Sequence, residues 1–307
     1  MLKRRIRVPL VCAMSLAIAG CQAGTGATGE AGAGVPTGPA TASRAPAASP
    51  AGTAAIWRPA HVVIVVMENK SYSSVVGDPA APYITLLARR GANFTASFAE
   101  THPSQPNYLA LFSGSTQGVT DDSCPQSFPA AANLASQLLD AGLTFAGYSE
   151  ALPRAGFMGC TAKNGRYARK HVPWTDFGTV PASANQPFTA FPRDFAALPT
   201  VSFVIPDMCG DMHDCTISTG DDWLRDHLDA YATWATAGDS LLIVTFDEDD
   251  YRGDNRIPTV LVGGRVRPGT YRQRIDHYTI LRTIEEMYGL APLGNAAKRH
   301  PLTGVWR

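Results

Sequence analysis

The sequence has no excess of charge of either sign and few charged residues overall. Lys and Arg number 26 against 26 Asp and Glu, and only 17% of the residues are charged. A chain without a basic surplus has no electrostatic footprint for nucleic acid, so no nucleic-acid partner is expected. With 45% hydrophobic residues the chain also lacks the composition of a disordered protein, and it can form a sizeable core.

No apolar run near the N-terminus is long enough for an ordinary membrane span. The run at 8–19 is short and follows one lysine and three arginines, which is typical of a secretion signal. Ile-Ala-Gly-Cys at 18–21 resembles the lipobox of bacterial lipoproteins and predicts lipidation of Cys21. An ordinary signal peptide cleaved at Ala23 or beyond is the alternative. Both interpretations predict an exported protein, held at the membrane by a lipid anchor or secreted.

Large apolar side chains are scarce in the next segment, which we expect to be a flexible linker at 21–56. Ala, Gly, Thr, Pro and Ser supply 30 of the 34 residues from 22 to 55. Such a composition forms no packed core. The sequence therefore predicts a lipoprotein signal peptide at 1–20, this linker, and one globular domain at 57–307.

The sequence lacks a Cys-x-x-Cys spacing, which makes a cysteine-rich metal site an unfavoured alternative. Of the six cysteines, one lies in the predicted signal and one is the lipidation candidate. The remaining four predict two disulfides in an oxidising compartment. Three connectivities are possible. We favour Cys124 with Cys160 and Cys209 with Cys215, because closing the short second loop loses the least chain entropy.

Apolar runs alternate with helical patterns in the globular part, which predicts a layered α/β fold. The run HVVIVV at 61–66 is continuous, as in a strand buried on both faces of a parallel sheet. The other predicted strands are 144–147, 201–205, 240–246 and 259–262, and the predicted helices are 83–90, 107–113, 131–141, 222–235 and 278–288. Ligands of such sheets bind beyond the carboxyl ends of the strands. Polar residues that follow strands are therefore the candidates for chemistry.

Carboxylate and amide side chains follow two of these strands. Glu68 and Asn69 come directly after the first strand, and Asp247 and Glu248 follow the strand at 240–246. Oxygen ligands of this kind suit a hard or borderline divalent cation. We expect the four residues to bind one divalent metal ion, whose identity these ligands leave open. Capping of the following helices or exposure in solvated loops is the alternative.

A hydroxyl group lies in the segment Thr-His-Pro-Ser-Gln-Pro-Asn at 101–107. Pro106 suits the first turn of a helix, so Ser104 is expected just before a helix N-terminus, where free N–H groups favour an anion. A serine there can attack a phosphoryl group once its pKa is lowered. On spacing alone, a serine that only caps the helix is the favoured interpretation.

Three histidines are candidates for phosphoryl binding or acid catalysis. His213 lies between the two cysteines of the proposed short disulfide, after the strand at 201–205. His171 and His277 lie in other loops. Each is weak evidence alone, because a single loop histidine is more often a hydrogen-bonded structural residue. His102 lies close to Ser104, although the neighbouring Pro103 affects its direction.

Taken together, these motifs resemble the bacterial phosphoesterase family of acid phosphatases and phospholipases C. The segments that carry the resemblance, in the order of the family, are MENKS, THPSQPNYLALFSG, YARKHVPW, PDMCGDMHD, GDDWL, LLIVTFDEDD and DHYTILRTIE. The resemblance implies an alkaline-phosphatase-like three-layer sandwich with a mostly parallel central sheet. It also implies a single divalent metal ion and a phosphoenzyme intermediate.

The resemblance implies roles for individual residues. Ser104 matches the nucleophile, and Asn107 matches the asparagine of the same element. The residues that match the metal ligands are Glu68, Asn69, Asp247 and Glu248, and those that the resemblance places around the phosphoryl group are His171 and His213. Asn107 and His277 are also expected to bind substrate. The implied activity is hydrolysis of small phosphate esters or phosphoinositides such as phosphatidylinositol 3-phosphate. A phospholipase C-type diesterase, or a non-catalytic surface lipoprotein that binds a phosphorylated ligand, is the alternative.

Overall fold

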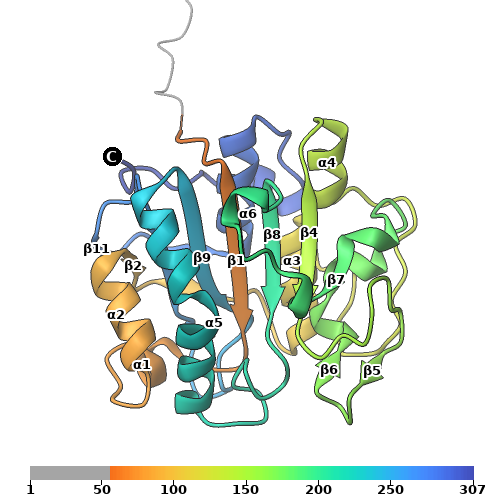
Figure 1. The fold of residues 1–307 in the computed structure, drawn as a ribbon, viewed down its shortest axis with the longest axis horizontal. Helices are drawn as coiled ribbons and strands as arrows, with labels where there is room; N and C mark the ends of the chain where they lie inside the picture. Colours follow the sequence, from red (N-terminus) through yellow and green to blue (C-terminus); the bar gives the residue numbers. More distant parts are fainter. Residues whose placement is uncertain (1–55) are drawn as a thin grey trace, which may run out of the picture. The chain divides into compact units, whose positions relative to one another are not determined.

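The computed structural model describes residues 56–307, so the predicted signal peptide, Cys21 and nearly all of the predicted linker lie outside the described residues. An eight-stranded sheet forms the centre of the domain (Figure 1). In spatial order its strands are β11 (Gly269–Tyr271), β2 (Ala92–Phe94), β10 (Thr259–Gly263), β9 (Ser240–Phe246), β1 (His61–Met67), β8 (Val201–Ile205), β4 (Phe145–Ser149) and β7 (Asn185–Pro187).

The sheet is mostly parallel, as predicted. β1 lies between β8 and β9 and pairs in parallel with both, and β4 continues the parallel pairing on the far side of β8. β10 is the exception, because it runs antiparallel to both β9 and β2. Every residue of β9 and all but the first of β1 are buried. A strand covered on both faces has no need of polar alternation, which explains the continuous apolar runs.

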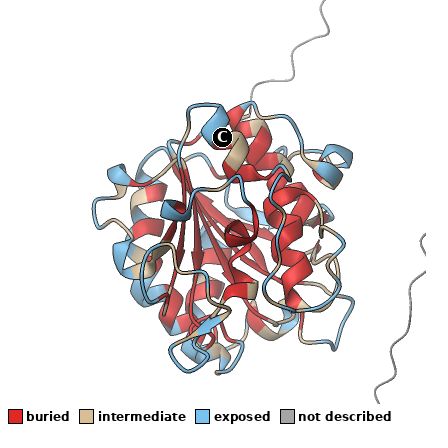
Figure 2. Cartoon of the chain, turned by 90° about the vertical axis from the view of Figure 1, so that its right-hand side faces the viewer, coloured by how far each residue is buried: buried red, intermediate tan, exposed pale blue. Residues whose placement is uncertain are grey.

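Helices cover both faces of the sheet and complete three layers. One face packs against α3 (Ser104–Ser113), α4 (Leu134–Asp140) and α6 (His277–Tyr288), and the other against α1 (Tyr72–Val75), α2 (Pro82–Arg90) and α5 (Ile217–Ala237). Successive side chains of β1 point to opposite faces, so Val62 and Ile64 join the first core while Val63 and Val65 join the second. Figure 2 shows the buried strands enclosed between the helices.

All five predicted strands and all five predicted helices are present. The strands at 201–205 and 240–246 have the predicted bounds, and the ends of the other elements are shifted. α4 begins at Leu134 rather than 131, because Asn133 and Ser136 form a capping box. α5 begins at Ile217 rather than 222, because Thr216 accepts a hydrogen bond from the Thr219 N–H at the cap.

The prediction missed elements of two to five residues, which are too short to produce a periodic signal. Besides α1 and the short strands β2, β7 and β11 of the main sheet, these are β3 (Ser97–Phe98) with β12 (Ile275–Asp276), β5 (Thr161–Ala162) with β6 (Tyr167–Ala168), and the 3₁₀ helices at Arg169–His171, Pro173–Asp176, Ala182–Ala184, Phe188–Ala190, Phe195–Ala197 and Gly294–Lys298.

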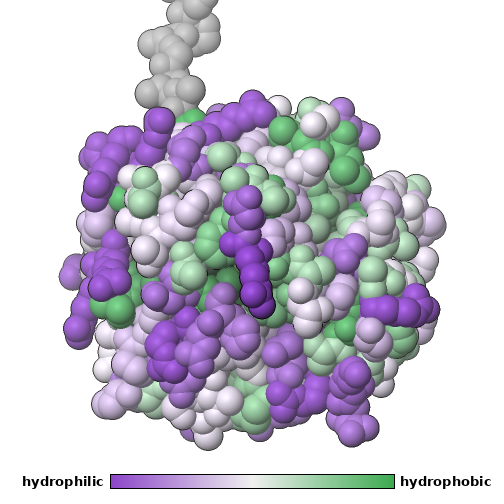
Figure 3. Space-filling view, in the orientation of Figure 1, coloured by the Kyte–Doolittle hydropathy of each residue, from purple (hydrophilic) through white to green (hydrophobic). Residues whose placement is uncertain are grey.

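Both expected disulfides are present, Cys124 with Cys160 and Cys209 with Cys215. Among the described helices, none combines the length and apolar character needed to cross a bilayer. Hydrophilic and hydrophobic residues are interspersed over the face of the domain in Figure 3.

Candidate active site

Two adjacent strands end side by side and place two carboxylates at one edge of the sheet. Met67 of β1 is paired with Phe246 of β9, so the residues that follow them, Glu68 and Asp247, emerge next to each other. The Asp247 N–H donates to the Met67 carbonyl oxygen at 2.9 Å, which extends the strand pairing to the site. On its other side, the Glu68 N–H donates to the Asp211 carbonyl oxygen at 2.8 Å. Three acidic residues, all at most 1% exposed, therefore meet at this edge.

Ser104 lies among these carboxylates. It is the first residue of α3 rather than the residue before the helix, a small correction to the prediction, and it is buried. Its Oγ donates to Glu68 Oε2 at 3.1 Å and also lies 3.3 Å from Glu248 Oε1. The hydroxyl thus has two candidate proton acceptors and lies at the positive end of the helix dipole.

Asn69 ties the two strand ends together. Its N–H donates to Asp247 Oδ1 at 3.0 Å, and its Nδ2 donates to Glu248 Oε1 at 2.6 Å. The residue adopts a left-handed backbone with φ of 46°, which Asn tolerates better than most residues. This turn leaves Asn69 Oδ1 buried and without a hydrogen-bond partner among the described residues.

Two residues expected to contact substrate have structural positions instead. Asn107 accepts from the Glu100 and Thr101 N–H groups, and its Nδ2 donates to the carbonyl oxygens of Thr101 and Pro103, so its amide has no free donor. It holds the turn that precedes Ser104. His277 is buried, and its Nε2 is bonded to the Asp247 carbonyl oxygen at 2.7 Å. We therefore correct the expectation of substrate contact for both.

The other two expected histidines lie at different depths. His171 is buried, its ring stacks on Tyr108 with centroids 5.0 Å apart, and its Nε2 lies 3.1 Å from Glu68 Oε1. Tyr108 also donates its hydroxyl to this Glu68 oxygen. His213 is exposed, with its ring centroid 6.1 Å from that of His171. His171 therefore lines the inside of the site and His213 its outer edge.

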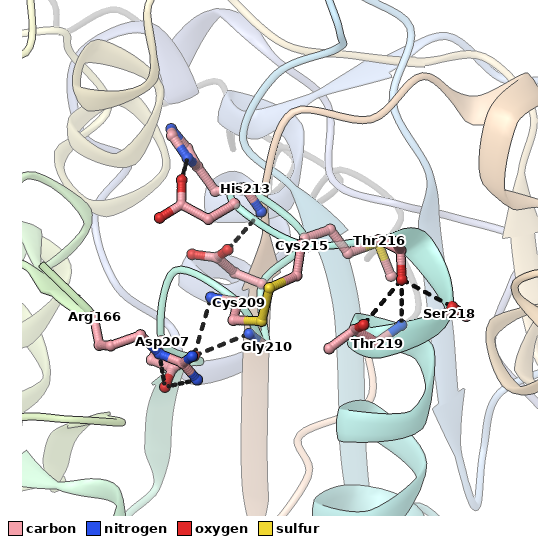
Figure 4. Close-up of a disulfide and its surroundings, with 12 residues drawn as sticks. Arg166, Asp207, Cys209, Gly210, His213, Cys215, Thr216, Ser218 and Thr219 are labelled. Atoms are coloured by element: carbon pink, nitrogen blue, oxygen red, sulfur yellow. Dashed lines mark hydrogen bonds and ion pairs between the residues drawn. A yellow bond between two sulfur atoms is a disulfide. The ribbon is translucent and has the colours of Figure 1, made fainter.

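A rigid loop between β8 and α5 carries His213 (Figure 4). Asp207 accepts from the N–H groups of Cys209 and Gly210 and is paired with Arg166. The Cys209–Cys215 disulfide closes the loop, and the His213 N–H donates to Asp211 Oδ1 at 2.7 Å.

Sequence reasoning missed two residues of the site, Asp211 and Lys170, and left the role of a third, His102, open. Asp211 was visible only as a neighbour of His213. His102 lies against Glu248, with its Nδ1 2.7 Å from Oε2, so the uncertain direction of this histidine is settled. Lys170 Nζ lies 2.6 Å from Asp122 Oδ2 beside the site. The sequence signal for each was only its adjacency to a residue already chosen.

Burial dominates the electrostatics of the site. It raises the pKa of Glu68, and the charges of Asp247 and Asp211 raise it further. The pKa of Glu248 is raised to about 8, first by burial and then by Asp247. Burial lowers the pKa of His171, as do Lys170 and His213, so its neutral form is favoured. Carboxylates that are costly to ionise in this way are stabilised by a nearby positive charge.

A divalent cation fits the donor atoms of this site. Asn69 Oδ1 and Asp247 Oδ2 are buried side-chain oxygens without hydrogen-bond partners in the described part of the chain. Buried polar atoms are normally satisfied, and an oxygen left over in an acidic cluster is a natural metal ligand. The chemistry and burial of the predicted ligands therefore agree with a metal site, and their assignment as ligands stays a prediction.

Solved structures place the fold in the alkaline-phosphatase-like class. A protein of the alkaline phosphatase superfamily from Vibrio parahaemolyticus superposes with a TM-score of 0.55 at 13% identity, covering 80% of this chain and 71% of that one. A phosphonate monoester hydrolase from Silicibacter pomeroyi gives a TM-score of 0.54 at 11% identity, covering 79% and 76%. At such low identity the likeness shows the fold alone, which agrees with the predicted class.

The chain belongs to the phosphoesterase family, whose model matches residues 78–291. It is 53% identical over 249 residues to a phosphatidylinositol-3-phosphatase of Mycobacterium tuberculosis, covering 80% of this chain and 83% of that protein. It is 32% identical to an acid phosphatase of Aspergillus fumigatus, of which it spans just over half, 55%. The matched range includes Ser104 and Asp247, whereas Glu68 and Asn69 lie just before it. The resemblance predicted from the motifs is confirmed, and the chain is a phosphoesterase.

Proposed function

We propose that the protein is an exported, metal-dependent phosphomonoesterase in which Ser104 is the nucleophile. The observation that carries the proposal is the position of the Ser104 hydroxyl, at the N-terminus of α3 and within 3.3 Å of oxygens of both Glu68 and Glu248. A module that only binds a phosphorylated ligand has no need of a serine between two carboxylates. The similarity to named phosphatases supports the same reaction class.

The reaction has two steps. Ser104 Oγ passes its proton to Glu68 Oε2 or Glu248 Oε1 and forms a bond to phosphorus, while the bond from phosphorus to the ester oxygen breaks. His213, at the outer edge of the site, donates a proton to the departing alcohol. Water then attacks phosphorus and gives a proton to His213, while the bond from phosphorus to Ser104 Oγ breaks. Ser104 Oγ takes its proton back from the glutamate, and phosphate is released.

Glu68, Asn69, Asp247 and Glu248 would hold the divalent cation. When bound, such an ion lowers the pKa of a nearby hydroxyl and stabilises negative charge on phosphoryl oxygens. Asn69 orients Glu248 through its Nδ2, and His277 steadies the backbone of Asp247 through its ring nitrogen.

Phosphatidylinositol 3-phosphate is the substrate we propose first. The support is the relative named for that activity, which the chain matches over most of its length. Export and lipid anchoring at Cys21 are proposed on the motif at 18–21.

Hydrolysis of p-nitrophenyl phosphate and bis-p-nitrophenyl phosphate by the purified full-length chain, with and without chelator, tests the function. Chelator-sensitive cleavage of the monoester is the expected result. Preference for the diester would replace the proposal with a phospholipase C-type activity. Cleavage of neither by folded, metal-loaded protein would refute it in favour of a binding lipoprotein. Phosphate release from vesicles that contain phosphatidylinositol 3-phosphate, against vesicles with the 4-phosphate, then tests the substrate.

A further inference from the structure

A groove lies between α5 and the segment that links β7 to β8. Its volume of about 880 Å³ falls within the roughly 300–1,000 Å³ of small-molecule sites. Three phenylalanines of the linking segment, Phe188, Phe191 and Phe195, line it together with Leu152 and with Ala230 of α5. The three phenylalanines are only half-buried, although burial of such side chains is favourable. The folded chain therefore leaves an apolar cleft, the phenylalanine groove, on its surface.

Aromatic contacts fix the wall of the phenylalanine groove. The rings of Phe188 and Phe191 stack with their centroids 5.4 Å apart. Phe191 also packs edge-on against Tyr148 of β4 at 5.2 Å, and Phe195 packs edge-on against Tyr231 of α5 at 5.4 Å. Such ring pairs hold side chains in defined positions. The groove is therefore formed before a ligand arrives, and binding does not have to order its wall.

Two cations line the same groove. Lys163 and Arg193 are exposed, and neither is paired with a carboxylate among residues 56–307. The acidic lining residues do have partners, because Asp226 is paired with Arg225 at 2.8 Å and Glu150 accepts a main-chain N–H at 2.9 Å. An apolar cleft with two unpaired cations complements a ligand that carries an apolar chain next to a negative charge.

The phenylalanine groove adjoins the loop that forms one side of the active site. The N–H that Glu150 accepts belongs to Asp207, whose carboxylate orders the loop that carries His213. Arg166 pairs with Asp207 and lies in the same β5–β6 turn as Lys163. Figure 1 shows this hairpin beyond the carboxyl ends of the parallel strands, at the edge of the sheet where the active site lies.

We propose that the phenylalanine groove binds an acyl chain of a glycerophospholipid, whose phosphodiester contacts Lys163 and Arg193. The inference rests on the proposed function, because this lipid is the substrate whose monoester phosphate reaches Ser104. A phosphodiester carries one negative charge and is joined through glycerol to apolar chains, so it matches both features of the groove. The groove then contacts a part of the substrate that does not react, which lowers KM for a lipid but not for a small soluble ester.

The test is calorimetric titration of the purified full-length chain with dioctanoyl phosphatidylinositol below its critical micelle concentration. This probe has the phosphodiester and the acyl chains but no monoester phosphate, so its binding does not depend on catalysis. The wild-type protein is expected to bind it at least about tenfold more tightly than glycerophosphoinositol, which has the same head group without acyl chains. Equal affinity for the two compounds, or no binding of the lipid, would overturn the inference.

Two variants locate the lipid within the structure. Ala230→Trp fills the groove from an exposed position of α5, and the double variant Lys163→Gln, Arg193→Gln removes both charges. Each is expected to weaken binding of the lipid by about tenfold or more. The matched controls should bind as the wild type does: Ala237→Trp at an exposed alanine of the same helix outside the groove, and Arg272→Gln at an exposed arginine between β11 and β12.

Circular dichroism establishes that each variant is folded, and either test variant decides the question if the other fails to fold. Wild-type affinity in a folded test variant would refute the inference.

Hydrolysis of p-nitrophenyl phosphate separates this inference from the proposed function. Both test variants should keep wild-type kcat/KM on this ester, because their changes lie outside the active site. With dioctanoyl phosphatidylinositol 3-phosphate, KM should rise by about tenfold while kcat stays nearly the same. An active esterase that does not bind the lipid would refute only the groove. A folded protein that binds the lipid and hydrolyses no ester would refute only the proposed function.

Discussion

Ser104 Oγ donates a hydrogen bond to Glu68 Oε2 at 3.1 Å, although 36 positions separate the two residues in the sequence. The other oxygen of the same carboxylate, Oε1, accepts the hydroxyl of Tyr108 and lies 3.1 Å from His171 Nε2. One buried carboxylate therefore connects the proposed nucleophile to the inner histidine. Any change at Glu68 is expected to affect the serine and the proposed metal site together.

Ser104→Ala is expected to lower turnover of a phosphomonoester by about 10³-fold or more, because the alanine has no oxygen to attack phosphorus. The fold should persist, since the change removes one atom. Steady-state kinetics and circular dichroism check both expectations. Ser113→Ala is the control, because Ser113 is a buried serine of the same helix whose hydroxyl donates to the Leu109 carbonyl oxygen. Comparable turnover in the two variants would contradict the role of Ser104.

His277→Ala is expected to lower kcat more than it raises KM. The ring supports the backbone of Asp247 from within the core and has no exposed surface for substrate. His277→Gln should recover part of kcat, because a glutamine amide can still donate to the Asp247 carbonyl oxygen. Steady-state kinetics of the two variants measure the changes in kcat and in KM separately. A large rise in KM with unchanged kcat would restore the original expectation of substrate contact.

Removal of each disulfide is expected to lower the free energy of unfolding by an amount that depends on loop length. Chain entropy gives about 2 kcal/mol for Cys209–Cys215 and about 4 kcal/mol for Cys124–Cys160, since the loops close at sequence separations of 6 and 36. Urea unfolding of the two Cys→Ser double variants measures both. Kinetics should show the reverse order, with the larger loss of kcat in the Cys209/Cys215 variant, because that loop carries His213 and Asp211. Equal kinetic losses would argue against a positioning role for the short loop.

Stability should fall as pH rises from about 4.5 to about 7, in part because of Glu285. Burial raises the pKa of Glu285 to about 7 from its usual 4.5, so in this interval the folded chain keeps a proton that the unfolded chain releases. The contribution is fully present below pH 4.5 and is lost above pH 7, with an upper bound of about 3 kcal/mol.

Glu285→Gln should flatten this pH dependence, because glutamine does not ionise and its oxygen can still accept from the Leu293 N–H. Urea unfolding at pH 5 and pH 8 measures the difference between the variant and the wild type. Glu286→Gln is the control, since the adjacent carboxylate is partly exposed and paired with Arg282. Parallel pH profiles for wild type and Glu285→Gln would show that Glu285 is not the source.

Cys21→Ser is expected to release the protein from the membrane of an expressing bacterium. Lipidation requires the cysteine thiol, and a serine cannot form the thioether. Fractionation of cells and mass spectrometry of the mature N-terminus check the outcome. Membrane retention of the serine variant would contradict anchoring at Cys21, and a wild-type protein that is itself released would favour the alternative of an ordinary signal peptide.

Local pattern in the sequence determined much of the framework. Continuous apolar runs predicted β1 and β9, because strands covered on both faces exclude polar side chains. Polar residues directly after those runs predicted Glu68 and Asp247, because parallel strands present their carboxyl ends at one edge. The spacing of four cysteines predicted both disulfides through the entropy of loop closure.

Only the tertiary structure decided which other groups reach that edge. Asp211 enters the site through a main-chain hydrogen bond from Glu68 to its carbonyl, and the ring of His277 is bonded to the Asp247 carbonyl. β10 reverses its direction beside β9 although its composition resembles that of the parallel strands. The periodicity of apolar residues along the chain shows which faces of a helix or strand are buried. The contacts of Asp211, His277 and β10 depend instead on how segments distant in the sequence pack together, and local spacing does not encode this packing.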